Sequence, residues 1–311
     1  MKLNELLQIK YPIIQGGMAN IATGAFAASV SNAGGLGLIA SGGLTAEALR
    51  QEIQSCKKAL SDQSTPFGVN IMLLNPDLEA IAKVVLEEKV PVVTTGAGNP
   101  SAYVKDWIAG GIKVFPVVAS VALAQRMEKY GATGVIAEGT ESGGHIGELA
   151  TMAIVPQVVS AVNIPVIAAG GIASGQQMAA AFALGACGVQ VGTCLLVSEE
   201  CPIHENYKQA IIKAKDSATT VTGRTVGVPV RVIKNQMARE YQKLEKTIED
   251  KMELEKLTLG SLRKAVSEGD ADRGSLMAGQ VAGMLKEIRP VAVILEELDT
   301  QCRDCIKNLT Y

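Results

Sequence analysis

Short apolar stretches recur about every 20–30 residues along the chain, and Ala-rich amphipathic stretches lie between them. Each short stretch is apolar on both faces, as parallel strands must be when helices cover the sheet. Eight strands are therefore predicted, over Pro12–Ile14, Leu36–Ala40, Phe67–Asn70, Val92–Thr95, Val114–Val118, Gly134–Glu138, Pro165–Ala169 and Val189–Gly192. This α/β pattern favours a closed (β/α)8 TIM barrel, with a doubly wound parallel sheet as the structural alternative.

The segments between the predicted strands carry the residues that commonly begin and end helices. Five of them begin with such a residue, namely Thr45, Pro76, Pro100, Ser120 and Ser174. Several end in glycine, as at Gly110 and Gly131. Strand and helix therefore alternate strictly, as a barrel requires.

The character of the chain changes after the eighth predicted strand, because residues from about 199 to 272 are far more charged than those before them. We interpret this segment as a charged helical insertion in a single barrel domain that spans residues 1–311. One helix is predicted within it, with an apolar stripe formed by Met237, Tyr241, Leu244, Ile248 and Met252. The stripe could pack on the barrel, cover the active site or pair subunits. The stretch Gly274–Gly283 is read as the start of the helix that closes the barrel.

Composition narrows the class of protein. Of 311 residues, 48% are hydrophobic and 19% charged, which suits one large core. The net charge of −2 provides no overall attraction for nucleic acid or an anionic membrane. The N-terminal residues lack the apolar region of a secretion signal, and glycines and charges interrupt every apolar run that could span a bilayer. A cytoplasmic protein without nucleic-acid or membrane partners is expected.

The six cysteines have no regular spacing and are expected to be free thiols. Cys302 and Cys305 form a CxxC pair, which we place on a C-terminal helix because neither a second ligand pair nor a following βα unit accompanies it. No cluster of His, Asp and Glu has metal-ligand spacing, so no metal site is predicted.

The ends of the predicted strands carry most of the candidate chemistry, since a barrel builds its active site from the loops that follow its strands. These loops are rich in glycine, which on its own indicates only tight turns. Barrels often bind a phosphate between the loops after strands seven and eight, where Gly171, Gly192 and Thr193 lie. Together these residues predict a phosphate site.

Other strand ends suit a flat aromatic cofactor such as a flavin. Gly16, Gly17 and Met18 permit close backbone approach, and Asn70 offers donors and acceptors to a ring edge. Glu138 could accept hydrogen bonds from ribityl hydroxyls, or it could be a structural carboxylate paired with a basic residue. The glycines of Gly35–Ala40 fit a dinucleotide motif by letter, but they precede a strand instead of opening a helix. Any nicotinamide must then bind without a Rossmann unit.

Two histidines are present, and only one lies at a predicted strand end. His204 falls in the polar segment and is expected at the surface. His145 follows two glycines in the loop after the sixth strand, where an imidazole can exchange a proton near neutral pH. His145 is therefore the predicted catalytic residue, with a structural loop histidine as the alternative.

Six motifs in order resemble the FMN-binding barrels of the nitronate monooxygenase and type II enoyl-acyl-carrier-protein reductase superfamily. They are YPIIQGGMA at 11–19, GVNIML at 68–73, AEGTESGGHIG at 137–147, IPVIAAGGIA at 164–173, QVGT at 190–193 and MAGQVAG at 277–283. The resemblance implies a homodimer, a monovalent cation for the reductases, and His145 in the active site. It also implies FMN contacts from Gly16, Gly17, Met18, Asn70, Glu138, Gly143, Gly171, Gln190, Gly192 and Thr193, with Ser275, Met277, Ala278 and Gln280 closing over the cofactor.

Two activities follow from the resemblance. In the first, FMN passes electrons from NADH or NADPH to a trans-2-enoyl acyl carrier protein in fatty acid elongation. In the second, FMN and oxygen oxidise alkyl nitronates. Glu138 and TTGAGNP at 94–100 look more like the reductase branch, since the nitronate branch often has glutamine at the position of Glu138. A non-catalytic flavin or phosphate binder is the third possibility. An acidic carrier protein could dock on Lys208, Lys213 and Lys215, which could equally form a solvated helix face.

Overall fold

Eight parallel strands form a barrel in the computed structural model of the protein, which describes residues 2–248 and 250–309. The strands are β1 (Ile13–Gln15), β2 (Gly37–Ala40), β3 (Phe67–Met72), β4 (Val92–Gly96), β5 (Lys113–Val118), β6 (Val135–Glu138), β8 (Val166–Ala169) and β9 (Gly188–Val191). They pair in the order β1-β9-β8-β6-β5-β4-β3-β2, and a parallel bridge between Ile14 and Leu36 joins the two end strands. The predicted barrel and its eight strands are confirmed.

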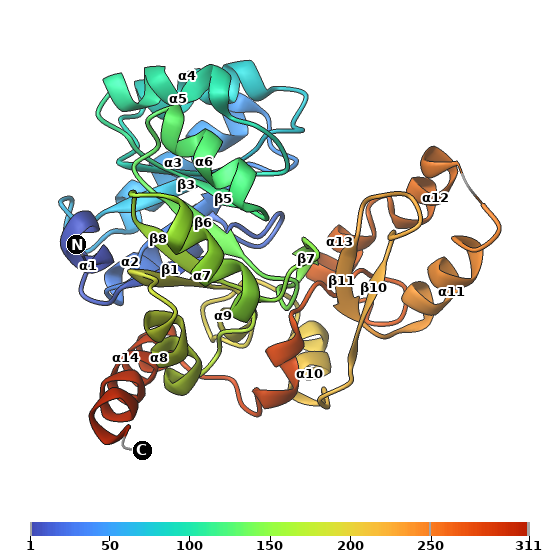
Figure 1. The fold of residues 1–311 in the computed structure, drawn as a ribbon. Helices are drawn as coiled ribbons and strands as arrows, with labels where there is room; N and C mark the ends of the chain where they lie inside the picture. Colours follow the sequence, from blue (N-terminus) through green and yellow to red (C-terminus); the bar gives the residue numbers. More distant parts are fainter. Residues whose placement is uncertain (1, 249, 310–311) are drawn as a thin grey trace.

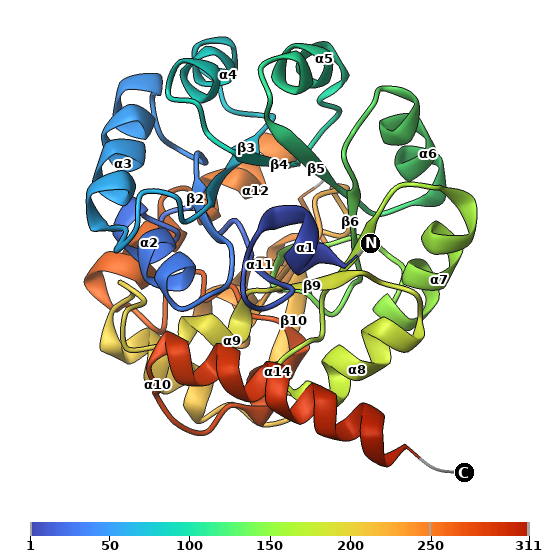
Figure 2. The same ribbon diagram turned by 90° about the vertical axis from the view of Figure 1, so that its left-hand side faces the viewer.

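Helices surround this sheet in a ring (Figure 2). They are α2 (Gly24–Asn32), α3 (Ala46–Ala59), α4 (Leu78–Glu87), α5 (Ser101–Ala109), α6 (Val121–Lys129), α7 (Thr151–Ala161), α8 (Gly175–Ala183) and α14 (Val291–Asn308). The side chains of Thr45, Ser120 and Ser174 accept hydrogen bonds from the first turns of α3, α6 and α8, as N-caps do. The predicted helix starts are correct here, whereas α4 begins at Leu78 and not at Pro76.

The amino-terminal end of the barrel is plugged by the short helix α1 (Leu3–Leu7), which lies over the middle of the ring in Figure 2. Leu3 and Leu7 join the buried cluster inside the barrel, whose members include Ile14, Leu38, Phe115, Ile136 and Ile167. The backbone N–H of Leu3 also donates to the carbonyl of Cys187, 3.1 Å away. The opposite end of the barrel, at the carboxyl-terminal ends of the strands, is therefore the end that is open to a ligand.

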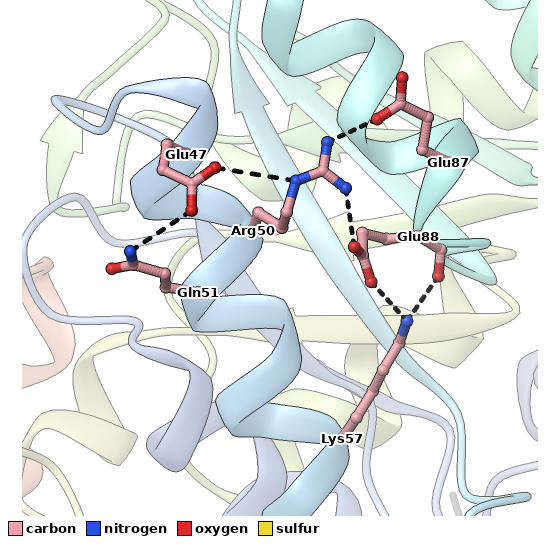
Figure 3. Close-up of polar contacts among 6 residues, drawn as sticks. All are labelled: Glu47, Arg50, Gln51, Lys57, Glu87 and Glu88. Atoms are coloured by element: carbon pink, nitrogen blue, oxygen red, sulfur yellow. Dashed lines mark hydrogen bonds and ion pairs between the residues drawn. The ribbon is translucent and has the colours of Figure 1, made fainter.

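Charged side chains join α3 to α4 on the outside of the barrel (Figure 3). Arg50 of α3 pairs with Glu87 and Glu88, and Lys57 pairs with Glu88 at 2.9 Å. Glu88 keeps only 14% of its side chain exposed, and its pKa is lowered chiefly by the hydrogen bond from Lys57. This network holds two neighbouring helices together and lies away from the strand ends.

The segment at 199–272, called the insertion below, forms a lobe beyond the carboxyl ends of the strands (Figure 1). After the short α9 (Thr193–Leu196) it contains α10 (Glu205–Ile212), β10 (Thr219–Thr222), β11 (Val230–Ile233), α11 (Gln236–Leu244), α12 (Lys251–Thr258), α13 (Ser261–Arg263) and a π-helical turn, Lys264–Glu268. The expectation of a purely helical insertion is therefore wrong. Its antiparallel strands β10 and β11 pair with each other, and β11 also pairs with β7 (Gly144–His145), which belongs to the loop after β6.

The apolar stripe of the insertion lies on two helices instead of one. Helix α11 ends at Leu244, and α12 begins at Lys251. Met237, Tyr241, Leu244 and Ile248 still pack in one cluster, together with Leu254 of α12. The side chain of Met252 lies outside the described residues. The break lets α12 fold back on α11, so the stripe forms a small core within the lobe.

The predicted helix start at Gly274–Gly283 is also only partly correct. Residues 274–279 are extended or turn backbone, and a short 3-10 helix begins at Gln280. The hydroxyl of Tyr207 donates to the carbonyl of Met277 at 2.8 Å, and the backbone N–H of Gly279 donates to the Thr193 hydroxyl at 2.9 Å. These bonds fix the segment across the mouth of the barrel.

Candidate functional site

A cavity of about 600 Å³ opens at the carboxyl ends of the strands. Its volume is in the range of cavities that bury a small organic ligand. The structure brings twelve of the predicted site residues to its wall, namely Gly16, Gly17, Met18, Asn70, Glu138, Gly143, His145, Gly171, Gln190, Gly192, Thr193 and Met277. The strand ends of a parallel barrel converge on one face, and this convergence collects residues that are far apart in the sequence.

The loops after β8 and β9 present backbone donors to this cavity. Within the described part of the chain, the backbone N–H groups of Gly171, Ile172, Gly192 and Thr193 donate no hydrogen bond. Buried or semi-buried N–H groups normally have partners, so four free donors on one wall form a cradle for an anion. Of the residues that the structure describes, the cavity wall carries Glu138 and Glu141 but neither lysine nor arginine. Backbone dipoles would therefore hold the anion.

Three of the predicted glycines stand in different surroundings on this wall. A Cβ on Gly17 would lie 2.2 Å from Cγ of Asn70, so glycine is needed there to make room for the asparagine. Gly171 has a φ of +73°, which favours glycine whatever the ligand. At Gly192 an added Cβ would meet nothing nearer than the sulfur of Met18, at 3.7 Å. Of these three, only Gly192 leaves open space for a ligand.

Glu138 ends β6 and faces the cavity. Its register partner on β8 is Ala169, which in turn aligns with Gln190 on β9, so the small alanine separates two polar side chains at one level. Burial raises the pKa of Glu138 to about 7, and Ser142 opposes this effect. No ion pair joins Glu138 to a basic residue in the described ranges, so the interpretation as a paired structural carboxylate is wrong.

The raised pKa predicts how Glu138 affects stability. Between pH 4.5, the ordinary pKa, and about 7, the unfolded chain loses the carboxyl proton while the folded chain keeps it. The folded chain then binds more protons, so its free energy of unfolding falls as the pH rises. Glu138→Gln should remove this loss, and we expect the flavin-free variant to gain on the order of 2 kcal/mol over the wild type between pH 5 and pH 8.

Urea unfolding of both flavin-free proteins at the two pH values would measure the difference. Glu148→Gln serves as the control, because Glu148 is an exposed carboxylate whose side chain stays 71% accessible. Parallel pH dependence in the wild type and Glu138→Gln would rule out a buried, proton-holding Glu138.

His145 stands on β7 and lines the cavity, as predicted. Its ring remains accessible from the cavity, while partial burial lowers its pKa below the ordinary value of 6.5. The imidazole is therefore neutral at neutral pH, with one N–H to donate and one lone pair to accept. Such a group is better suited to hold or polarise a carbonyl oxygen than to store an extra proton.

Three predicted residues lie behind the cavity wall instead of on it. Ser275 pairs its hydroxyl with that of Ser261 at 2.7 Å, and the backbone N–H of Gln280 donates to the carbonyl of Glu141 at 2.9 Å. Ala278 packs against Gly143, where an added Cβ would lie 2.7 Å from the alanine backbone. Their part is to support the wall, and Met277 with Val281 supplies the surface that faces the cavity.

Other wall residues were not predicted. Most are apolar, and the larger ones include Met72, Leu123, Ile146, Ile172, Leu196, Leu262 and Val281. Gln190, which was predicted, is 7% exposed, and its side-chain oxygen has no hydrogen-bond partner among the described residues. A buried acceptor without a partner is costly unless a ligand supplies the donor.

The positions of residues outside the cavity agree only in part with the predictions made from the sequence. His204 caps α10 and is exposed, and Cys302 and Cys305 lie on α14 as expected. Lys208, however, is 6% exposed and donates to the carbonyl of Ser198 at 2.7 Å, so the suggested docking lysine is a buried one. Among the described residues we find no cluster of His, Cys, Asp or Glu able to hold a metal ion.

The described helices include none of sufficient length and apolarity to cross a membrane.

Many known proteins are similar to this chain in fold and in sequence. The FabK structure from Thermotoga maritima is 49% identical, covers 98% of this chain and 96% of its own, and superimposes with a TM-score of 0.95. The nitroalkane oxidase from Streptomyces ansochromogenes is 28% identical over 99% of both chains, with a TM-score of 0.89. A probable nitronate monooxygenase of Staphylococcus saprophyticus is 33% identical, over 94% of this chain and 95% of its own length.

A family model described as nitronate monooxygenase matches residues 1–301. This match covers the barrel, the cavity wall and the insertion together, and the first curated relative covers 94% of the chain. The chain is therefore an oxidoreductase that belongs to the nitronate monooxygenase family.

Proposed function

We propose that this protein is an FMN-dependent enoyl-acyl-carrier-protein reductase that uses NADH or NADPH. The observation that carries this proposal is the 49% identity to FabK, an enoyl-acyl-carrier-protein reductase, over 98% of the chain. Identity to the proteins named for nitronate oxidation is lower, at 33% and 28%. The apolar residues of the cavity wall support the proposal as well, since an acyl chain needs an apolar surface.

The cavity wall fits a phosphorylated flavin. The free N–H groups of Gly171, Ile172, Gly192 and Thr193 would hold the phosphate, and the unpartnered oxygen of Gln190 would accept from a ribityl hydroxyl. Asn70, which already donates to the Thr94 hydroxyl at 2.9 Å, keeps its carbonyl oxygen for the ring edge. Bound FMN would supply electron transfer between the nicotinamide and the β-carbon of the enoyl thioester.

The residues of this chain would orient the substrate and manage its charge. Neutral His145 would donate its N–H to the thioester oxygen, where negative charge develops during reduction. Glu138, which stays partly protonated near neutral pH, can donate a hydrogen bond within the same cavity. The apolar residues Met277, Leu262 and Val281 would exclude water from this region.

Nitronate oxidation is the second candidate, because the family model and the curated relatives carry that name. The two activities draw electrons from different donors. A reductase must accept electrons from a nicotinamide and pass them to an enoyl thioester without oxygen. A nitronate oxidiser takes electrons from the nitronate itself and needs oxygen to turn over.

Anaerobic mixing separates the two candidates. We expect NADH or NADPH to bleach the flavin absorbance rapidly, and crotonyl or longer enoyl thioesters to restore it. Bleaching by an alkyl nitronate with no response to enoyl thioesters would overturn the proposal in favour of the second candidate.

The remaining expectations belong to this proposal. They are an acyl carrier protein as the partner that delivers the substrate, a homodimer in solution, and a monovalent cation that stimulates the reaction. With Lys208 buried, only Lys213 and Lys215 of the three suggested docking lysines are exposed.

A further inference from the structure

The strand that carries His145 belongs to the insertion sheet and not to the barrel. Gly144 and His145 form β7, which pairs antiparallel with β11, with Val230 opposite His145 and Arg231 opposite Gly144. The next residue continues the contact, since the N–H of Ile146 donates to the carbonyl of Pro229 at 3.1 Å. The position of the imidazole in the cavity therefore depends on where the insertion holds β11.

Arg231 makes the strongest side-chain link between β11 and this loop. Its Nε and Nη2 both donate to the carbonyl of Thr140, at 3.1 Å and 2.9 Å, and its Nη1 donates to the hydroxyl of Thr219 on β10 at 3.3 Å. The flat guanidinium thus spans the hairpin and the loop that leads from β6 to His145. Lysine, with a single point charge, cannot reproduce this fork.

Arg231 is also unusual in its burial. Only 6% of the residue is exposed, and no carboxylate in the described ranges lies within ion-pair distance of it. Burying a guanidinium without an ion-pair partner costs desolvation free energy. Hydrogen bonds to backbone carbonyls offset this cost only when their geometry is fixed. Arg224, close by on the surface, offers a contrast: it forms an exposed ion pair with Glu148 at 2.7 Å.

The same strand also reaches the other side of the cavity. Val232 forms an antiparallel bridge with Met277, and the N–H of Ile233 donates to the carbonyl of Leu276 at 2.8 Å. Strand β11 therefore contacts two wall residues, His145 and Met277, from behind.

We propose that Arg231 is a positioning residue that fixes the loop from Thr140 to His145 against the insertion and so sets the place of the imidazole in the cavity. The proposal rests on the proposed function only in taking His145 as the histidine that contacts the substrate. Displacement of such a group by about 1 Å can lower turnover by a large factor.

Titration of His145 by NMR tests this proposal without any substrate. The chain has only two histidines, so His204 provides an internal reference. The charged and titratable side chains of the loop and of the hairpin packed against it are Glu138, Glu141, Glu148, Arg224 and Arg231. Arg231→Lys keeps the charge of this set but removes the fork.

We expect Arg231→Lys to raise the pKa of His145 toward its ordinary value of 6.5, because a loosened loop exposes the ring to water and relieves the burial that lowers its pKa. His204 should not move. Arg224→Gln, which breaks the exposed ion pair on the same loop, should leave both histidines unchanged. An unshifted His145 in Arg231→Lys would overturn the proposal, whichever substrate the enzyme proves to use.

Turnover provides a second test through a double-mutant cycle. Arg231→Lys should lower kcat about 10-fold in the wild type yet less than about 2-fold in the His145→Ala background, because both changes act on one interaction. Equal losses in both backgrounds would show that Arg231 only stabilises the fold. If Arg231→Lys fails to fold, Thr219→Val removes one acceptor of the guanidinium and should shift the pKa of His145 in the same direction; no shift would overturn the proposal.

Discussion

His145→Ala should lower the turnover of an enoyl thioester about 10²-fold, which is the loss that follows removal of one hydrogen-bond donor from a developing oxyanion. The imidazole lines the cavity and is kept neutral by partial burial, so its N–H is available to a carbonyl oxygen. The expected loss lies in kcat, because the donor would interact most strongly in the transition state.

Flavin binding should survive this substitution, since His145 lies on the insertion sheet and the free backbone donors lie after β8 and β9. Steady-state kinetics together with the flavin absorbance per chain would check both parts. His145→Gln is the matched control, because its amide keeps an N–H donor, and we expect it to retain part of the activity. If the alanine variant kept wild-type turnover, His145 would be a structural loop residue and not a catalytic one.

Gly192→Val should weaken flavin binding by roughly 10²-fold or more, because its side chain would block the free N–H groups from a phosphate, and each hydrogen bond to a charged group contributes about 1.5–3 kcal/mol. The barrel should still fold. An added Cβ at Gly192 meets no protein atom closer than 3.7 Å, and the φ of −125° is open to other residues.

Gly96→Val is the matched control for this substitution. Gly96 also lines the cavity, at the end of β4, and an added Cβ there has no neighbour within 4 Å. It lies on the other side of the barrel from β8 and β9, so the control should keep most of its flavin. Flavin content after purification and Kd from fluorescence titration would measure both variants. Equal retention in the two would place the phosphate elsewhere.

Gly171 would be a poorer choice for this experiment. Its φ of +73° disfavours valine whatever occupies the cavity, and an added Cβ would lie 3.1 Å from Cβ of Glu141. If Gly171→Val lost its flavin, a distorted loop and a blocked phosphate site would explain the loss equally well.

The barrel could be predicted because each of its strands is built around a short apolar run, and the contacts of a strand with neighbouring helices follow from that run. The same rule locates the strand ends, and with them Glu138, Gln190 and Gly192. The hairpin in the insertion escaped notice, although Thr219–Thr222 and Val230–Ile233 are rich in β-branched residues and flank glycines. The high charge of the surrounding segment favours helix throughout and so hides this signal.

Other features depend on contacts between distant parts of the chain. The pairing of His145 with Val230 and the approach of Leu262 to the cavity arise only when the insertion docks on the barrel. No local pattern encodes them. The break between α11 and α12 falls in a stretch without proline or glycine, so no helix-ending residue marks it.

The closure of the barrel has a consequence for how the chain folds. Strand β1 pairs with β9, and the plug helix α1 rests on residues from strands throughout the barrel. During synthesis, β1 must therefore keep one edge unpaired until β9 has left the ribosome. The apolar faces of Leu3 and Leu7 stay exposed for the same period. Such a nascent chain completes its long-range contacts slowly. Until then it exposes apolar surface that chaperones can bind.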